Sequence, residues 1–140
     1  MNSVSDVEKL IGLYRSGASI HEIKTDRSYI DYPKAGGYRS HHFVFKFRGE
    51  GHAEHYNGLR IEVQLRSRLQ HVWATAVEAV GMVRRQDLKA GEGDANWLRL
   101  FALMSSEFAE LEGCPVVPGT EDRSARLQEI RDLDHMRKRI

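Results

Sequence analysis

Two short segments of the chain alternate between apolar and polar residues. In residues 41–48, Phe43, Phe45 and Phe47 share one side. Residues 59–66 place Leu59, Ile61, Val63 and Leu65 on one side and Arg60, Glu62, Gln64 and Arg66 on the other. A period of two predicts two β-strands, and Asn57-Gly58 between them favours an antiparallel hairpin. The pattern therefore predicts a sheet with one face covered by helices and a polar face that meets solvent or a ligand.

Helical periods occupy most of the remaining chain. The stripe Val7, Leu10, Ile11 and Tyr14, with Ser5 and Glu8 as a capping box, predicts a helix over about residues 6–16. Further helices are predicted for 67–85, 96–112 and the highly charged segment 121–140. A weak strand pattern covers 19–24, and the polar segment 25–40 is predicted as a loop. The fold class is therefore α/β (α+β), a small mixed or antiparallel sheet flanked by helices.

Composition narrows the classes of protein. The 140 residues include 21 Lys and Arg against 20 Asp and Glu, so a net charge of +1 predicts no general binding of nucleic acid. No apolar run approaches the ~20 residues of a membrane-spanning helix. The single cysteine, Cys114, excludes an internal disulfide. We expect one soluble, cytoplasmic domain with no membrane contact.

Two features could carry chemistry. Glu62 lies mid-strand among cations, where it forms either a cross-strand ion pair or a general base or metal ligand aimed into a cleft. The loop before the first strand combines Pro33, a glycine pair, the cations Lys34 and Arg39, and the ring of Tyr38. Cations and an aromatic face suit a phosphorylated nucleotide. The alternative is a turn whose charged side chains are merely solvated.

Three blocks of residues resemble a known family. The run Asp31-Tyr32-Pro33-Lys34-x-Gly36-Gly37-Tyr38-Arg39-Ser40-x-His42 resembles the loop of RelA/SpoT-type alarmone synthetases. Ile61-Glu62-Val63-Gln64-Leu65-Arg66-Ser67 is similar to that family's glutamate strand, and His71-x-Trp73-Ala74 to the start of its next helix. The resemblance covers about residues 4–85. It implies a partial synthetase domain over 1–90, with 91–140 as a C-terminal helical extension.

The resemblance implies a GTP pyrophosphokinase, which moves pyrophosphate from ATP to the 3′-hydroxyl of GTP or GDP with Mg²⁺. Glu62 would be the acidic residue of the catalytic cleft, which either activates the 3′-hydroxyl or helps to hold the metal. Tyr38 would stack on the guanine. The remaining nucleotide-binding residues would be Lys34, Arg39, Ser40 and His42, which contact the phosphates or their surroundings, together with Gln64 and Arg66, which shape the acceptor pocket.

The chain departs from the family pattern at two points. Gly36 stands where the family usually has asparagine, which removes one amide contact to the base. Family members also carry, before the loop, a basic ATP-binding segment and a strand whose aspartate ligates magnesium. About thirty residues precede the loop here, and their pattern is a helix and a weak strand. We therefore expect this chain alone to be inactive.

Three functions stay open at this point. One is alarmone synthesis, and a second is the toxin-type reaction on tRNA 3′ ends. The third is a non-catalytic module that binds a nucleotide or a partner protein. We also expect self-association, through an open sheet edge or the charged C-terminal helix.

Overall fold

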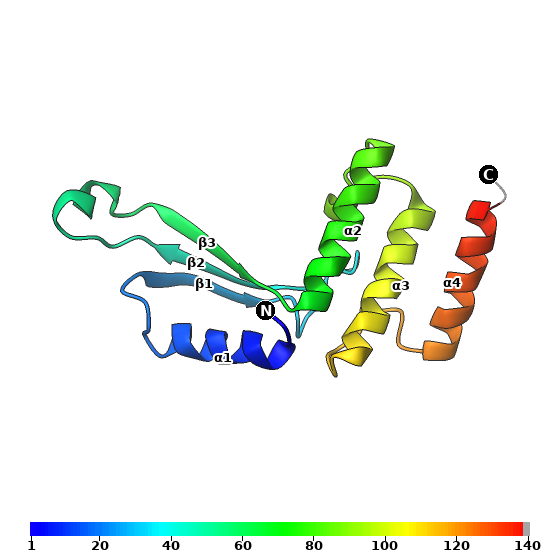
Figure 1. The fold of residues 1–140 in the computed structure, drawn as a ribbon, viewed down its shortest axis with the longest axis horizontal. Helices are drawn as coiled ribbons and strands as arrows, with labels where there is room; N and C mark the ends of the chain where they lie inside the picture. Colours follow the sequence, from blue (N-terminus) through cyan, green and yellow to red (C-terminus); the bar gives the residue numbers. More distant parts are fainter. Residues whose placement is uncertain (139–140) are drawn as a thin grey trace.

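The computed structural model describes residues 1–138 and has the predicted α+β class. A three-stranded antiparallel sheet has the order β1-β2-β3. Helix α1 lies along one face of the sheet, and α2, α3 and α4 stand side by side at one end of it (Figure 1). The elements are α1 (Val4–Arg15), β1 (Glu22–Ser28), β2 (His41–Lys46), η1 (Gly51–Tyr56), β3 (Arg60–Leu65), α2 (Arg68–Arg84), η2 (Leu88–Ala90), α3 (Ala95–Leu111) and α4 (Arg123–Lys138).

Helix α1 closes the apolar face of the sheet. Val7 and Ile11 pack against Phe43, Phe45 and Leu65 in one buried cluster. The helix begins two residues earlier than predicted, because Ser3 and not Ser5 is the N-cap and forms a capping box with Asp6. The expectation that helices cover one face only is confirmed, and the opposite face of the sheet carries the polar row.

Register places the two polar rows side by side. Strands β2 and β3 pair His42 with Gln64 and Val44 with Glu62. Because opposite residues of an antiparallel pair point to the same face, these side chains share the uncovered face. The predicted hairpin is therefore correct, although its connection contains the 3₁₀-helix η1.

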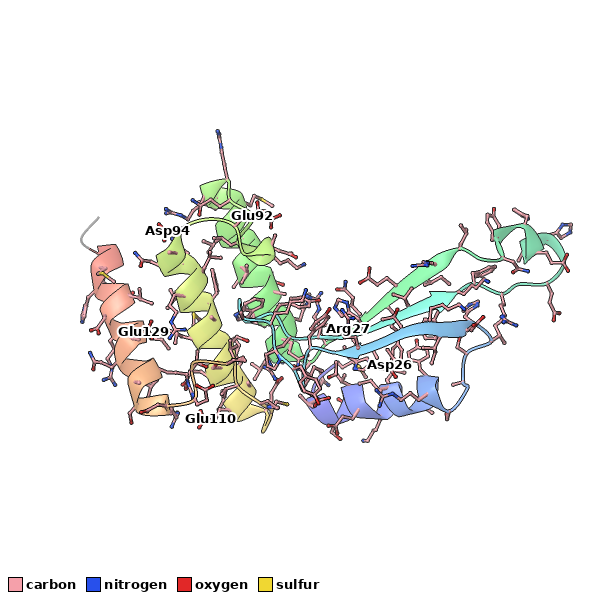
Figure 2. All side chains as sticks on the ribbon, turned by 180° about the vertical axis from the view of Figure 1, so that it is seen from behind. Asp26, Arg27, Glu92, Asp94, Glu110 and Glu129 are labelled. Atoms are coloured by element: carbon pink, nitrogen blue, oxygen red, sulfur yellow. The ribbon has the colours of Figure 1, made fainter. Side chains whose placement is uncertain are left out.

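Strand β1 corrects the predicted loop over 25–40. It runs to Ser28 through four polar residues, and a register irregularity lies between Ile23 and Thr25. This irregularity hides the alternation in the sequence. β1 lies at the edge of the sheet, and edge strands commonly carry charged and polar side chains. Figure 2 shows the consequence: Asp26 points towards α1, where it pairs with Arg15 (2.6 Å), while Arg27 points to the uncovered face.

A second core joins the loop before β2 to helices α2 and α3. Trp73 and Phe101 pack with Tyr38, and the Trp73 indole donates to the Phe101 carbonyl (2.8 Å). Gly37 enters this core with a positive φ of 97°, and Ser105 Oγ donates to its carbonyl (2.5 Å). The loop is therefore anchored on the helices and is not a free surface turn.

Helix α4 is held to α3 by buried charge as well as apolar packing. The guanidinium of Arg126 is buried, donates to Glu107 (2.8 Å) and pairs with Glu110. Arg99 of α3 reaches across to Glu129 (2.7 Å), and both Glu110 and Glu129 lie between the two helices in Figure 2. Within residues 1–138, no helix has the length and apolar character needed to cross a membrane.

Candidate functional site on the uncovered face of the sheet

Four side chains on the uncovered face form a ring, linked by three hydrogen bonds and one close contact between an imidazole and a carboxylate. We call Tyr38, His42, Glu62 and Gln64 the polar ring. Tyr38 Oη lies 2.8 Å from His42 Nε2 and 3.3 Å from Gln64 Oε1. Glu62 Oε1 lies 3.2 Å from His42 Nδ1 and accepts from Gln64 Nε2 at 3.0 Å. The structure thus brings together four residues that lie up to 26 positions apart in the sequence.

The partners of His42 fix its protonation. The Tyr38 hydroxyl has one hydrogen and donates it to Gln64 Oε1. The hydroxyl oxygen therefore accepts from His42 Nε2, which carries the imidazole proton in this assignment. Burial lowers the pKa of His42, Lys34 and Arg66 lower it further, and Glu62 opposes them. The lowered pKa favours a neutral imidazole at pH 7, and the hydrogen bond that orients the glutamate comes from Gln64.

Glu62 keeps one oxygen free. The hydrogen bond from Gln64 and the contact with His42 both use Oε1, and the side chain is 55% exposed. Among the hydrogen bonds within residues 1–138, none reaches Oε2. An oriented carboxylate with an open oxygen on an uncovered face can accept a proton or bind a cation.

A pair of tyrosines and a lysine border the polar ring. Lys34 Nζ lies 4.6 Å from the ring centre of Tyr29 and 5.4 Å from that of Tyr38. Tyr29 packs edge-on against His42, and Arg27 donates to its hydroxyl (3.2 Å). Tyr38 is 8% exposed, whereas Tyr29 is partly exposed. Tyr29 therefore offers the more accessible ring.

Sequence reasoning missed Tyr29. Tyr29 N donates to Ser40 O (2.8 Å) and continues the pairing of β1 with β2 beyond Ser28. The sequence gives no signal of this pairing, because residues 25–28 are all polar and the segment 25–40 was predicted as a loop.

Arg39 and Ser40 lie elsewhere. Arg39 is 3% exposed and donates to Glu112 Oε2 (2.7 Å), and Ser40 Oγ donates to the Leu65 carbonyl (3.2 Å). Both side chains are committed to protein groups in the interior. Their contact with a nucleotide thus stays a prediction that the geometry does not support.

The last of the predicted residues, Arg66, is at the border of the site. Its charge lowers the pKa of His42 and of Glu78, so it lies near the polar ring. The two loop glycines differ: Gly36 has open space around it, whereas Gly37 is packed against α2 and α3. Backbone access for a ligand is therefore available at Gly36 only.

Few side chains at the candidate site could ligate a metal ion. Within residues 1–138, no three His, Cys, Asp or Glu side chains gather into a group that could hold a metal ion. Mg²⁺ in nucleotide enzymes often takes only one or two carboxylates, with phosphate oxygens and water as the other ligands. Glu62, with its open oxygen, fits that role as a single protein ligand.

We expect the free energy of unfolding to fall as the pH is lowered below about 6.5, the ordinary histidine value. Burial lowers the pKa of both His41 and His42. The unfolded chain therefore takes up these protons at higher pH than the folded chain, and protonation favours unfolding. Urea unfolding at pH 7.5 and 5.5 measures the difference, and His42→Gln should reduce it.

Equal stability at the two pH values would contradict this assignment. The hydrogen bond from Arg15 lowers the pKa of Asp26. Its stabilising contribution is complete above the ordinary aspartate value of about 3.9 and is lost only at lower pH. The loss of stability caused by histidine protonation below about pH 6.5 and the loss caused by Asp26 protonation below about pH 3.9 can therefore be measured separately.

A family model for the region found in RelA / SpoT proteins matches residues 1–83. The chain belongs to the RelA/SpoT family. The matched region contains β1, β2, β3 and the whole polar ring, so the resemblance noted in the sequence is confirmed for the family. A search of curated protein sequences gives no match.

Solved structures share the fold. Small alarmone synthetase 2 from Bacillus subtilis superposes with a TM-score of 0.65 at 16% identity, over 80% of this chain and 57% of that one. Small alarmone synthetase 1 from the same organism, bound to its product pppGpp, gives 0.64 at 19%, over 80% and 54%. A GTP pyrophosphokinase family protein from Streptococcus pneumoniae gives 0.59 at 21%, over 81% and 52%. This RelA/SpoT chain thus spans little more than half the length of these proteins.

Proposed function

We propose that this chain forms the guanosine-nucleotide side of a (p)ppGpp synthetase, where GDP or GTP accepts pyrophosphate from ATP. The observation that carries the proposal is the polar ring with its open Glu62 oxygen, on a sheet face that no helix covers. Membership of the RelA/SpoT family and the shared fold with alarmone synthetases support it.

Different residues would bind the base and the phosphates of the nucleotide. Guanine would lie over Tyr29 and Tyr38, displacing Lys34 from above their rings. Lys34 then turns to the phosphates, because an ammonium binds a phosphate more strongly than it binds an aromatic face. Arg27 and Arg66 stand at the border and add positive charge on the same side.

The chemistry centres on Glu62. Its open oxygen would take the proton of the 3′-hydroxyl as that oxygen forms a bond to the β-phosphorus of ATP. The bond from that phosphorus to the α-phosphate breaks, and AMP leaves with the electron pair. Gln64 holds the carboxylate in place through a hydrogen bond to Oε1, and the imidazole of His42 lies beside the same oxygen. In the alternative role, Glu62 would instead use its open oxygen to hold Mg²⁺ together with phosphate oxygens, and the metal would neutralise phosphate charge.

We expect Lys34→Ala to weaken binding of GDP about tenfold, the equivalent of 1.4 kcal/mol, and to change guanosine binding little. The reason is that Lys34 recognises phosphate and not the base. Isothermal titration of both ligands measures this. Lys9→Ala removes an exposed lysine from α1, on the covered side of the sheet, and is the matched control.

Two results would contradict the proposal. One is an unchanged GDP affinity in Lys34→Ala. The other is a loss of GDP and guanosine affinity in equal measure, which would assign Lys34 to the packing of the tyrosines.

A further inference from the structure

A hollow of about 250 Å³ lies between α1 and the segment that joins β1 to β2. Ile11 of α1 and Ile30 of the segment form a buried floor, together with the side chain of His41, which is 1% exposed. Glu8 of α1 and Asp31 of the segment also line the hollow, and both residues are exposed. The hollow therefore has a largely apolar floor with one buried polar ring, and two carboxylates at its opening.

The imidazole of His41 offers an acceptor to this hollow. Its Nε2 lies 2.8 Å from Asp26 Oδ1, on the α1 side of the sheet, where Figure 2 shows Asp26. Because a carboxylate only accepts, Nε2 carries the proton of the neutral ring. Burial lowers the pKa of His41, and Asp26 opposes that shift, so the ring is neutral at pH 7. Among the hydrogen bonds within residues 1–138, none reaches Nδ1, which is left as a buried acceptor without a donor.

Negative charge exceeds positive charge around the hollow. The guanidinium of Arg15 lines it too, but both of its hydrogen bonds go to Asp26 (2.6 and 2.9 Å). The pKa of Arg15 is raised first by Asp26 and also by the charge of Asp31, which lies nearby. In the part of the chain that the structure describes, the carboxylates of Glu8 and Asp31 make no ion pair and no hydrogen bond. Three carboxylates therefore surround one guanidinium, and two of them have no partner.

We propose that this hollow binds a small organic cation, a guanidinium on a short aliphatic stem. A guanidinium presents several N–H donors in a planar fork and has no acceptor, which matches two open carboxylates and one imidazole acceptor. The side chains of Ile11 and Ile30 would pack against the methylene groups of the stem.

The site is separate from the proposed nucleotide site. His41 and His42 are neighbours on β2, so their side chains point to opposite faces of the sheet. His42 belongs to the polar ring on the uncovered face, whereas His41 lies on the face that α1 covers. The cation site therefore does not depend on the proposed function.

The test titrates the wild-type chain with butylguanidinium and follows the imidazole of His41 by NMR. We expect saturable shifts of the His41 signals, at a Kd of about 1 mM or below. Butylurea has nearly the same shape but no charge, and a carbonyl oxygen replaces one amino group. It should give no saturable shift, because its oxygen would meet acceptors only.

Paired variants test the two carboxylates. Glu8→Gln/Asp31→Asn should weaken butylguanidinium binding about tenfold or more, with GDP affinity within about twofold of the wild type. Glu50→Gln/Glu54→Gln is the matched control, since it removes two exposed carboxylates from the connection between β2 and β3. It should leave butylguanidinium binding unchanged.

A further arm separates two sources of the same chemistry. N-acetylarginine methylamide represents an arginine side chain of a protein. Tighter binding of this probe than of butylguanidinium would assign the hollow to a protein arginine, and weaker binding would assign it to a free small molecule. Both results support the cation site.

Three results would overturn the cation site. They are equal affinities for butylguanidinium and butylurea, an unchanged butylguanidinium affinity in Glu8→Gln/Asp31→Asn, and no saturable shift in the folded wild-type chain. A wild-type chain that binds butylguanidinium but not GDP would support the cation site and overturn the proposed function alone.

Discussion

Replacing Glu112 with alanine is expected to lower the free energy of unfolding by about 3–5 kcal/mol, as for other buried pairs that lose one partner. Glu112 is the sole carboxylate that pairs with Arg39 among residues 1–138, and the two side chains are 8% and 2% exposed. It also accepts from Ser67 Oγ and from Gln70 Nε2 (3.2 Å). Its removal leaves a buried guanidinium without a counter-charge.

The loss of Glu112 should also affect the candidate site, because Glu112 contacts residues beside both the loop of Tyr38 and strand β3. Arg39 follows Tyr38 directly, and Ser67 caps α2 just after β3. We therefore expect Glu112→Ala to weaken GDP binding as well, by loosening Tyr38 relative to Gln64. Urea unfolding gives the stability and calorimetric titration the affinity.

The chain offers a matched control for this variant. Glu78 forms an exposed ion pair with Lys89, so Glu78→Ala should cost less than about 1 kcal/mol. A loss of similar size for Glu112→Ala would show that the buried cluster does not organise the loop. Replacing Arg39 and Glu112 together by methionine should recover part of the loss, because no buried charge is then left unpaired.

Gly37→Ala is expected to be the most damaging single-methyl change in the loop. Its backbone has a φ of +97°, which costs a non-glycine residue about 1–3 kcal/mol. A Cβ there would lie 2.9 Å from both Ser105 Cβ and Trp73 Cζ2 and 3.1 Å from Ala102 Cα. Overpacking of this kind adds a further cost of about 1–3 kcal/mol.

The neighbouring glycine is its control. A Cβ at Gly36 would have no neighbouring atom within 4 Å, so Gly36→Ala should leave stability nearly unchanged. Thermal and urea unfolding of the two variants give the comparison. Equal stability of Gly36→Ala and Gly37→Ala would contradict the close packing of this loop against α2 and α3.

Periodicity predicted most of the architecture because it reports burial. The alternation at 41–48 and 59–66 marks a sheet with one covered face, and the register of β2 on β3 follows that alternation. The helices at 68–84 and 95–111 were predicted within a residue or two, and the second buries residues on two sides, because it contacts both α2 and α4. Strand β1 (Glu22–Ser28) was predicted only in part, by the weak pattern over 19–24, because its polar residues 24–28 have no apolar period.

The site was predicted in part, for a related reason. Lys34, Tyr38, His42, Glu62 and Gln64 gather on one face. Strand alternation indicated this for the strand residues, and the family resemblance for the loop residues Lys34 and Tyr38. Arg39 looks equally suited to phosphate in the sequence, yet its partner Glu112 lies 73 positions away. The residues around Arg39 in the sequence do not indicate this ion pair. Tyr29 is the reverse case: it lies at the site but was not predicted. Its position beside Lys34 depends on the pairing of β1 with β2, which the sequence does not show.

The central claim is that the uncovered face of the sheet binds a guanosine nucleotide at the polar ring. The most direct measurement is a GDP titration of the wild-type chain, followed by NMR at the imidazole of His42, with ADP as the comparison. The account predicts saturable shifts of the His42 signals with GDP, at a Kd below about 1 mM, and weaker shifts with ADP. Unchanged His42 signals at millimolar GDP, in a folded chain, would contradict it.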